Sequence, residues 1–440
     1  MRPSSTLFAL VAGGAVTAGL MAPPLRAQAP VTPPAGVMAD TLALTLADVF
    51  HLARTRGLDL EASRQMIGMA AGDLRESRVT GFNPTVGYQR FESGRPGESA
   101  EYGLTVSENL GWVTQRGPRV AAARSALERT VAEVGDQERL ATREAGRVFV
   151  AALAAERRLA LADQMVAATR RLSDVTQIQL REGEISVLEA NLAEIEFGRT
   201  QARALTARRE ATTTLLELRR WIGVEPTTAI LLVEPADVAL GPGRLIEDSL
   251  MAMAVRRRPD LVAQRRAVEE AAVRRQLAVR EGIPMPTLMG MLARDPGGAN
   301  ARLGIGVSMP IALVDRNQGR VQREAFGYEQ AAIRLEAVLL TVRLEVREAR
   351  LAYLAASEEV ASLESRVLTP VRDNLALLDS AYRAGKVGLP TLLLLRNQLF
   401  EAEVDYWRAW QAKREALLRL QAAIGVPTGS ATVTSLEDTP

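Results

Sequence analysis

The chain has 440 residues, with 54 basic and 52 acidic side chains and a formal charge of +2, so it lacks the net basic field of a general nucleic-acid-binding protein. Hydrophobic residues make up 47% and charged residues 24%, which is the balance of a folded protein. There is no cysteine and one histidine, His51, which excludes disulfides, thiolate metal sites, cysteine nucleophiles and lipid attachment to an N-terminal cysteine. We expect no nucleic-acid partner, no cofactor, no metal site, no enzymatic activity, and a structural role for His51.

The first 29 residues have the pattern of a secretory signal peptide. A positive start at Arg2 precedes an apolar run from Leu7 to Leu20 and small residues at cleavage spacing, with the cut expected near Ala27 or Ala29. The apolar run is too short and too interrupted for a membrane anchor, and no later stretch reaches about 18 uncharged apolar residues. We therefore expect the mature chain to leave the cytoplasm.

The remainder of the chain repeats one plan. Gly183 and Gly385 lie 202 positions apart (385 − 183), as do Gly223 and Gly425 (425 − 223), and each pair stands in similar local sequence. Each copy is predicted to contain a helix, a strand pair, a very long helix, a tight turn and a further long helix. The predicted domains are a signal peptide at 1–29, a first repeat at 30–228, a linker at 229–243 with a possible lone strand at Ile230–Val233, a second repeat at 244–428 and a tail at 429–440.

Long coiled-coil-like helices dominate both copies. From Pro118, which suits a first helical position, to the stop at Gly183 the sequence predicts one helix of about 97 Å. Apolar residues recur along it, Val131 among them, at alternating spacings of four and three, and the second copy does the same. The second seam is Leu339, Val342, Val346, Ala349, Tyr353, Ala356, Val360, Leu363 and Val367. Extra alanine and leucine on other faces favours a closed ring of helices, and an elongated coiled-coil rod is the alternative.

Two hairpins with a period of two are predicted within 82–108 and 285–311. Tyr102, Leu104 and Val106 alternate with small or polar residues, and the stretch 301–309 alternates in the same way. Apolar residues outside and polar residues inside, over about nine positions, are typical of transmembrane strands around a watery lumen. The soluble alternative is two amphipathic hairpins on a small core. The residues predicted to face the lumen are Glu101, Thr105, Ser107, Arg302 and Ser308.

Four strands per chain cannot enclose a lumen. About eight strands make the smallest closed barrel, and an open sheet in lipid would leave its edges unpaired. The chain must therefore oligomerise if it enters a membrane, and three copies would supply twelve strands.

Several segments resemble the TolC-like outer-membrane efflux proteins, and they are most similar to the CzcC-like heavy-metal and cation efflux branch. They are Leu46–Phe50 with Leu52–Ala53, Arg181–Ser186, Arg258–Leu261, Ile283–Leu288, Val307–Gly319 and Tyr382–Val387. The resemblance covers nearly the whole mature chain. It implies a mainly α fold with a small β part, in which duplicated long-helix hairpins form a trimeric α-barrel and four strands per chain contribute to a twelve-stranded transmembrane β-barrel.

The resemblance also implies a function. The expected protein is a homotrimeric duct in the cell outer membrane, in contact with outer-membrane lipid and with a long periplasmic extension. It would passively conduct heavy-metal cations from a periplasmic adaptor and an inner-membrane pump of the resistance-nodulation-division type. Export of drugs or other organic compounds through the same architecture is the first alternative. A periplasmic coiled-coil adaptor or scaffold is the alternative from another class, and two helical hairpins with two strand pairs argue against it.

The tips of the helical hairpins carry the residues that the resemblance singles out. An acidic residue six positions after the tip glycine lines a periplasmic constriction in the family. That position is Glu189 in the first copy and Thr391 in the second, so a double acidic ring is not expected. Tyr382 is assigned to the same constriction, and a solvated helix charge is the alternative for Glu189. The residues expected to dock the adaptor, or else to be ordinary helix-end residues, are Arg181, Gly183, Glu184, Arg383, Gly385 and Lys386.

Overall fold

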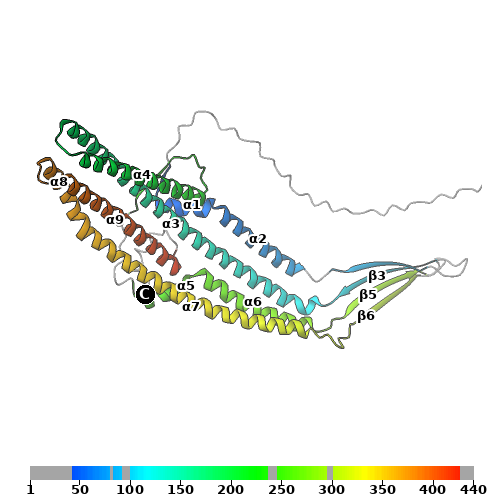
Figure 1. Ribbon diagram of the computed structural model, residues 1–440. Helices are drawn as coiled ribbons and strands as arrows, with labels where there is room; N and C mark the ends of the chain where they lie inside the picture. Colours follow the sequence, from blue (N-terminus) through cyan, green and yellow to red (C-terminus); the bar gives the residue numbers. More distant parts are fainter. Residues whose placement is uncertain (1–41, 80–82, 92–99, 236–244, 295–300, 427–440) are drawn as a thin grey trace, which may run out of the picture. The chain divides into compact units, whose positions relative to one another are not determined.

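The computed structural model describes residues 42–79, 83–91, 100–235, 245–294 and 301–426 (Figure 1). The expected signal peptide, most of the linker, the loops of both β-hairpins and the tail lie outside the described residues. The elements in chain order are β1 (Leu42–Leu44), α1 (Leu46–Arg56), α2 (Leu58–Val79), β2 (Thr85–Phe91), β3 (Glu101–Asn109), α3 (Trp112–Glu182), α4 (Val187–Ile222), β4 (Ile230–Leu232), α5 (Glu247–Arg257), α6 (Pro259–Glu281), β5 (Thr287–Arg294), β6 (Ala301–Ser308), α7 (Gln318–Leu363), the π-helical segment η2 (Glu364–Leu368), α8 (Thr369–Arg383) and α9 (Leu389–Ala423). The expected fold class, mainly α with a small β part, is confirmed.

Four glycines with a left-handed backbone mark the ends of the long helical arms. They are Gly183, Gly223, Gly385 and Gly425, with φ between 64° and 78°, and they form the two pairs that are 202 positions apart in the sequence. A side chain at Gly223 would begin 2.8 Å from the carbonyl oxygen of Arg56, where α1 ends, and one at Gly425 would meet the end of α5 in the same way. The duplication therefore reflects a repeated contact as well as a repeated element order.

The first long helix starts earlier than expected. α3 has 71 residues, or about 107 Å, and begins at Trp112, so the prediction that Pro118 is its first residue is wrong. Proline inside a helix leaves the carbonyl four positions earlier without its usual donor. Here the guanidinium of Arg280 donates to the carbonyl of Thr114 at 3.1 Å, which satisfies that acceptor and lets the helix run through Pro118.

The second long helix is interrupted by η2. This five-residue π-helical segment joins α7 to α8, and Pro370 is among the first residues of α8. The hydroxyl of Thr369 donates to the carbonyl of Glu364 at 3.2 Å. A widened turn is a common way to accommodate a proline that has no N–H to donate.

The helices pack side by side in a layer that has two open edges. α2 and α4 pack on α3, α3 packs on α6 and α9, and α6 and α9 pack on α7. The buried residues of α7 follow the predicted seam, which is confirmed there: Val342, Val346, Ala349, Tyr353, Ala356 and Val360. α2 and α4 therefore lie at one edge of the helical layer, and α7 lies at the other.

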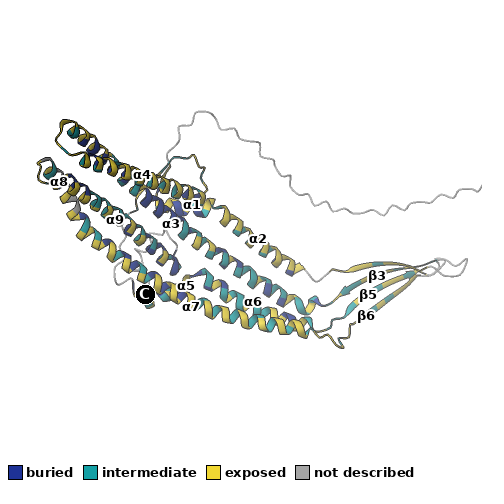
Figure 2. Ribbon diagram, in the orientation of Figure 1, coloured by how far each residue is buried: buried dark blue, intermediate teal, exposed yellow. Residues whose placement is uncertain are grey.

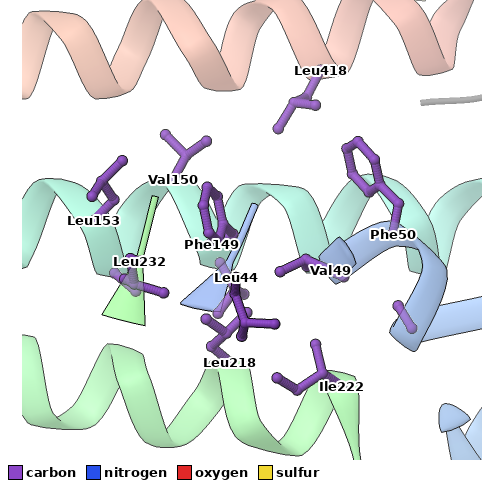
Figure 3. Packing of buried hydrophobic residues seen from close by; sticks show 14 of the residues in the cluster. Leu44, Val49, Phe50, Phe149, Val150, Leu153, Leu218, Ile222, Leu232 and Leu418 are labelled. Atoms are coloured by element: carbon purple, nitrogen blue, oxygen red, sulfur yellow. The ribbon is translucent and has the colours of Figure 1, made fainter. Parts of the chain in front are cut away.

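Two apolar clusters hold the middle of the helical layer together. The first lies among α1, α3, α4 and α9 and includes Phe149, Leu218 and Leu418 (Figure 3). The second lies among α5, α6, α7 and α9 and includes Leu420, the residue equivalent to Leu218 in the second copy. Residues 230–232 are not a lone strand, because β4 pairs in parallel with β1, which the sequence did not reveal. Leu44 of β1 is fully buried in the first cluster.

The other four strands form one antiparallel sheet in the order β2-β3-β5-β6. Its inner strands β3 and β5 belong to different repeats, so the sheet joins the two copies. Figure 2 shows its strands in the colours of exposed and intermediate residues. The edge strand β2 follows the edge helix α2 in the chain, and the edge strand β6 precedes the edge helix α7. Each free edge of the sheet is therefore connected to one edge of the helical layer.

Candidate functional site

The four-stranded sheet has one apolar and one polar face. Directly paired residues of an antiparallel ladder share a face, and the register puts Tyr88, Leu104, Leu292 and Leu303 in one row. Every large apolar side chain on this side is exposed: Val86, Tyr88, Tyr102, Leu104, Val106, Leu288, Leu292, Leu303, Ile305 and Val307. An apolar sheet face that nothing within the described chain covers requires an apolar environment outside it.

The five residues predicted to face the lumen all lie on the opposite face. They are Glu101, Thr105, Ser107, Arg302 and Ser308. Their shared position follows from the register, whereas their role in a lumen stays a prediction. Met289 and Met291 are on this polar face too, each paired directly with a glycine of β6 and leaning over it. These two methionines therefore lie on the face opposite the exposed apolar row.

The tips of the two helical hairpins are tight turns built around glycine. Gly183 and Gly385 have φ values of 78° and 70°, and their amides bond back to the carbonyls of Leu180 and Tyr382. A residue with a side chain disfavours this left-handed conformation, so glycine is required at both tips.

Glu189 is the third residue of α4 and forms a capping box with the N-cap residue Ser186. Its carboxylate accepts hydrogen bonds from the backbone N–H and the hydroxyl of Ser186, both at 3.0 Å, and its own N–H donates to that hydroxyl at 3.2 Å. The bonds from the Ser186 backbone and side chain lower the pKa of Glu189 below its usual 4.5. The residue is therefore a fixed negative charge at the first tip, and neither alternative considered from sequence included its capping role.

Tyr382 belongs to the apolar cluster that joins the two tips. It packs against buried Leu172 of α3, Ala193 of α4 and Leu392 of α9. Burial, and next the nearby charge of Glu189, raise the pKa of Tyr382, so its hydroxyl stays protonated at neutral pH. The structure thus brings Tyr382 and Glu189 together. Thr391 is exposed in the first turn of α9.

The other tip residues are solvent-facing. Arg181, Glu184 and Lys386 are exposed beside the two glycines. The guanidinium of Arg181 donates to the carbonyl of Gln177 at 3.2 Å, a common bond at a helix end. Arg383 is the last residue of α8, and its side chain lies outside the described part. Docking at these positions stays a prediction.

A buried charge network, which the sequence did not reveal, joins the two repeats at the start of α6. Arg258 donates to Asp260 at 2.6 Å, to Glu345 of α7 at 2.5 Å and to the carbonyl of Ala423 at 3.3 Å. Beside it, Arg139 of α3 donates to the carbonyl of Ala422 at 2.7 Å. The network caps the C-terminus of α9 with two cations, a favourable arrangement for the exposed carbonyls of a helix end.

The pKa values of two carboxylates at this network, Asp136 and Asp260, are shifted in opposite directions. Burial raises the pKa of Asp136, although its partner Arg139 opposes the change. Burial acts in the same sense on Asp260, but the hydrogen bonds and charge of Arg258 outweigh it and lower the pKa of Asp260. The contact with Arg258 therefore sets the direction of the pKa shift of Asp260, and burial sets that of Asp136.

Other candidate sites in the described ranges offer no reactive arrangement. A groove of about 650 Å³ between α3, α4 and α9 has charged walls, but Arg158 is paired with Glu210 at 2.6 Å and Arg203 with Glu401 at 3.6 Å. Among the described residues, no three histidine, cysteine or acidic side chains lie close enough together to hold a metal ion. His51 is exposed on α1 instead of serving a packed structural role, because Val49, Phe50 and Ala53 form the buried side.

No helix within the described ranges combines the length and the apolar composition that crossing a bilayer requires.

Comparisons with known proteins identify the architecture. The family described as "Outer membrane efflux protein" matches residues 250–426, and no curated protein matches the chain. The Campylobacter jejuni CmeC outer membrane channel superposes with a TM-score of 0.75 at 14% identity, over 86% of this chain and 85% of that one. The Vibrio cholerae outer membrane protein VceC gives 0.71 at 15% identity, over 87% and 96%. The open state of the Neisseria gonorrhoeae MtrE outer membrane channel gives 0.70 at 17% identity, over 87% and 89%.

The matched family is a channel family and not a class of enzymes. Over residues 250–426 the chain carries the sequence signature of the outer membrane efflux proteins, and over most of its length it has the fold of the solved outer-membrane channels.

Proposed function

We propose that this protein is a homotrimeric outer-membrane duct of a tripartite export system. The main support is that the sheet and the helical layer both have open edges, and that these edges lie on the same two sides of the chain. The sheet has free edges at β2 and β6, and the helical layer ends at α2 and α4 on one side and at α7 on the other. A second copy placed against α7 would therefore meet the first through helices and strands together.

The free edge of α7 carries a second apolar stripe that matches this arrangement. Phe326, Ile333, Leu340, Leu344 and Leu351 are exposed at heptad-like spacing. Leu340 stands two positions before buried Val342, which places the stripe about 160° away around the helix axis. α7 therefore has apolar residues on opposite sides, as expected for a helix with a neighbour on each side in a closed ring.

The sheet supports the same assembly. β2 leads away from the helices and β6 returns to them, so β6 of one copy and β2 of the next would pair in antiparallel fashion, like the strands within one chain. Three copies would close twelve strands and remove all the edges, with the apolar face toward lipid and the polar face toward a watery lumen.

At the other end of the assembly, the tips would narrow the duct. Three copies of Glu189 around a threefold axis would form a ring of negative charge that attracts cations, with Tyr382 packed behind it and Thr391 on the second tip. The polar turns around Gly183 and Gly385 would meet a periplasmic adaptor, which in turn connects to an inner-membrane pump of the resistance-nodulation-division type. No step in this function makes or breaks a covalent bond.

We further propose divalent heavy-metal cations as the cargo, as the CzcC-like resemblance suggests. The acidic Glu189 and the polar lumen face support it. Export of drugs or organic compounds remains the alternative cargo.

Assembly is tested by cell fractionation and electrophoresis. We expect a trimer in the outer-membrane fraction that dissociates only on heating. The double variant Leu340→Glu and Leu344→Glu should reduce the trimer to monomers, whereas Arg334→Gln, also exposed on α7 but outside the stripe, should leave it intact. A soluble wild-type monomer would contradict the proposed duct.

Docking is tested by disulfide or thiol cross-linking in a chain that has no native cysteine. Glu184→Cys and Lys386→Cys, at the two tips, should cross-link to the adaptor, whereas Thr212→Cys, exposed far along α4, should not. Equal cross-linking at all three positions would argue against docking at the tips.

Cargo is tested by deleting the gene and measuring tolerance to zinc, cobalt, nickel, copper and organic toxins. Loss of metal tolerance that the wild-type gene restores would support cations. Unchanged metal tolerance together with greater drug sensitivity would favour the alternative cargo. In planar bilayers, Glu189→Gln should reduce cation selectivity without changing assembly.

A further inference from the structure

Residues 309–314, in the loop 309–317 between β6 and α7, form a highly exposed apolar segment outside the sheet. Its sequence is Met-Pro-Ile-Ala-Leu-Val. Met309 is 59% exposed, Ile311 and Leu313 are each 78% exposed, and Val314 is 84% exposed. Four large apolar side chains at this level of exposure within six residues indicate a surface that is covered in the working protein.

The loop is held at both ends. Ser308 before it pairs with Thr287 in the sheet. After it, Asn317 adopts a left-handed backbone, its N–H donates to Asp315 at 2.9 Å, and its side-chain amide donates to the carbonyl of Ala278 in α6 at 2.7 Å. The apolar residues are therefore presented at a defined height, where the sheet meets the helices.

The first repeat makes the equivalent connection without such a loop. β3 ends at Asn109 and α3 begins at Trp112, with only Leu110 and Gly111 between them. The second repeat uses residues 309–317 for the same step. Because two residues are enough to join a strand to its helix in this fold, the apolar loop is not needed for the connection itself.

The chemistry on either side of the loop indicates its partner. Leu303, Ile305 and Val307 on the apolar face of β6 lead directly into it. Immediately after it the chain is charged and polar at residues 315–318, and Glu281 forms ion pairs across the joint with Arg320 at 2.5 Å and with Arg119. An apolar segment between an apolar strand face and a charged belt matches the boundary between acyl chains and headgroups.

We propose that residues 309–314 insert into the acyl boundary of the periplasmic leaflet of the outer membrane and fix the depth of the sheet. The partner is phospholipid. This inference rests on the proposed function, because it requires the apolar sheet face to lie in the bilayer. A second copy of the chain is the competing occupant, since β6 is an edge strand.

Site-directed spin labelling tests the proposal. Single cysteines replace Leu313 in the loop, Ile305 on the apolar sheet face and Asp315 in the charged belt, in a full-length chain that has no other cysteine. The trimers are reconstituted in vesicles of phosphatidylethanolamine and phosphatidylglycerol, and the label's collisions with lipid-soluble O₂ and a water-soluble nickel chelate are measured. We expect the O₂-to-nickel ratio at 313 to resemble that at 305 and to exceed that at 315 several-fold.

The possible outcomes distinguish a failure of the loop proposal from a failure of the proposed duct. A lipid-like ratio at 305 with a water-like ratio at 313 would overturn the loop proposal and leave the duct intact. Low collision rates with both reagents at 313 would place the loop under a second copy and would also overturn it. A water-like ratio at 305 would reject the membrane sheet, and the loop proposal would fail with it.

Discussion

Replacing Arg258 by methionine tests whether the buried charge network holds the second repeat together. The side chain of Arg258 is 3% exposed and neutralises two carboxylates from different elements, Asp260 of α6 and Glu345 of α7. Methionine fills a similar volume but provides no charge and no donor. The variant therefore removes the cation and leaves Asp260, whose side chain is 23% exposed, without its partner.

We expect different losses of stability when Arg258 and when Glu345 is replaced. Removing one partner of a buried ion pair costs about 3–5 kcal/mol, so Arg258→Met should lose about that much stability. The side chain of Glu345 is 47% exposed, and for Glu345→Gln we expect a loss below about 1 kcal/mol. With an unfolding entropy of about 2.1 cal/mol/K per residue, the 440-residue chain should lose about 3–6 °C of Tm in the first variant and about 1 °C in the second.

Thermal unfolding followed by circular dichroism at 222 nm measures both shifts, and pH provides a second test. In the wild type the lowered pKa of Asp260 gives a stabilisation that is present above its usual pKa of 3.8 and is lost as the pH falls through the lowered value. Without Arg258, burial should raise the pKa of Asp260, so protonation relieves the variant as the pH falls from 7 to 4. Equal shifts for the two variants, or an undiminished deficit of Arg258→Met at pH 4, would refute this reasoning.

Two further predictions concern the helix ends at the tip. Gly183→Ala and Gly385→Ala should each cost about 1–2 kcal/mol because both positions are left-handed, whereas Gly198→Ala, in open space inside α4, should be neutral or stabilising by up to about 1 kcal/mol; the same thermal assay distinguishes them. Ser186→Ala should cost about 1 kcal/mol at neutral pH because α4 loses its capping hydroxyl. Since the bonds from Ser186 lower the pKa of Glu189, the difference between wild type and variant should narrow as the pH falls below 4.5, and a constant difference would contradict the carboxylate's part in the cap.

Periodicity predicted the buried face of a helix where its neighbours all lie on one side. Every fully buried residue of α7, from Val342 to Val360, lies on the heptad seam, because α6 and α9 both pack against that side. In α3 the predicted seam matches the buried residues less closely. Val131 is exposed, although the spacing predicted it to be buried. α3 has neighbours in several directions at different heights, and a repeat of apolar residues identifies a face but not the height at which a partner covers it.

The features that the sequence did not reveal depend on contacts between distant residues. Arg258 reaches Glu345 across 87 positions and the carbonyl of Ala423 across 165, so its local motif could be matched to a family but not explained. The predicted helix start at Pro118 is wrong for the same reason. The donor that replaces the missing proline N–H belongs to Arg280, 162 positions away in the sequence. The sequence predicted a strand at the position of β4 but not its partner β1, because a three-residue strand is too short for a period to be recognised.

The start of α4 at the first tip also carries a local sequence signal. Ser186 and Glu189 have the spacing of a capping box, which predicts a helix start with a carboxylate bonded to the N-cap residue. The family resemblance singled out Glu189 for a pore-lining role, which stays a prediction, and the structure shows that its carboxylate caps α4 through Ser186. A pore-lining role would use the oxygen lone pairs that the cap leaves free, so the two roles are compatible.

The two repeats differ where the proposed assembly would have to distinguish them. Their helix ends are equivalent, since paired glycines meet α1 and α5 in the same manner, yet only the second repeat has the loop 309–317 and only the second has η2. Both departures lie on the polypeptide that forms the α7 edge. In a ring of three copies, six similar hairpins would therefore alternate between two kinds. Each α7 edge would carry the apolar loop at the membrane end and the π-helical segment toward the tip, so neighbouring hairpins of the proposed ring would differ and its symmetry would follow the number of chains instead of the number of hairpins.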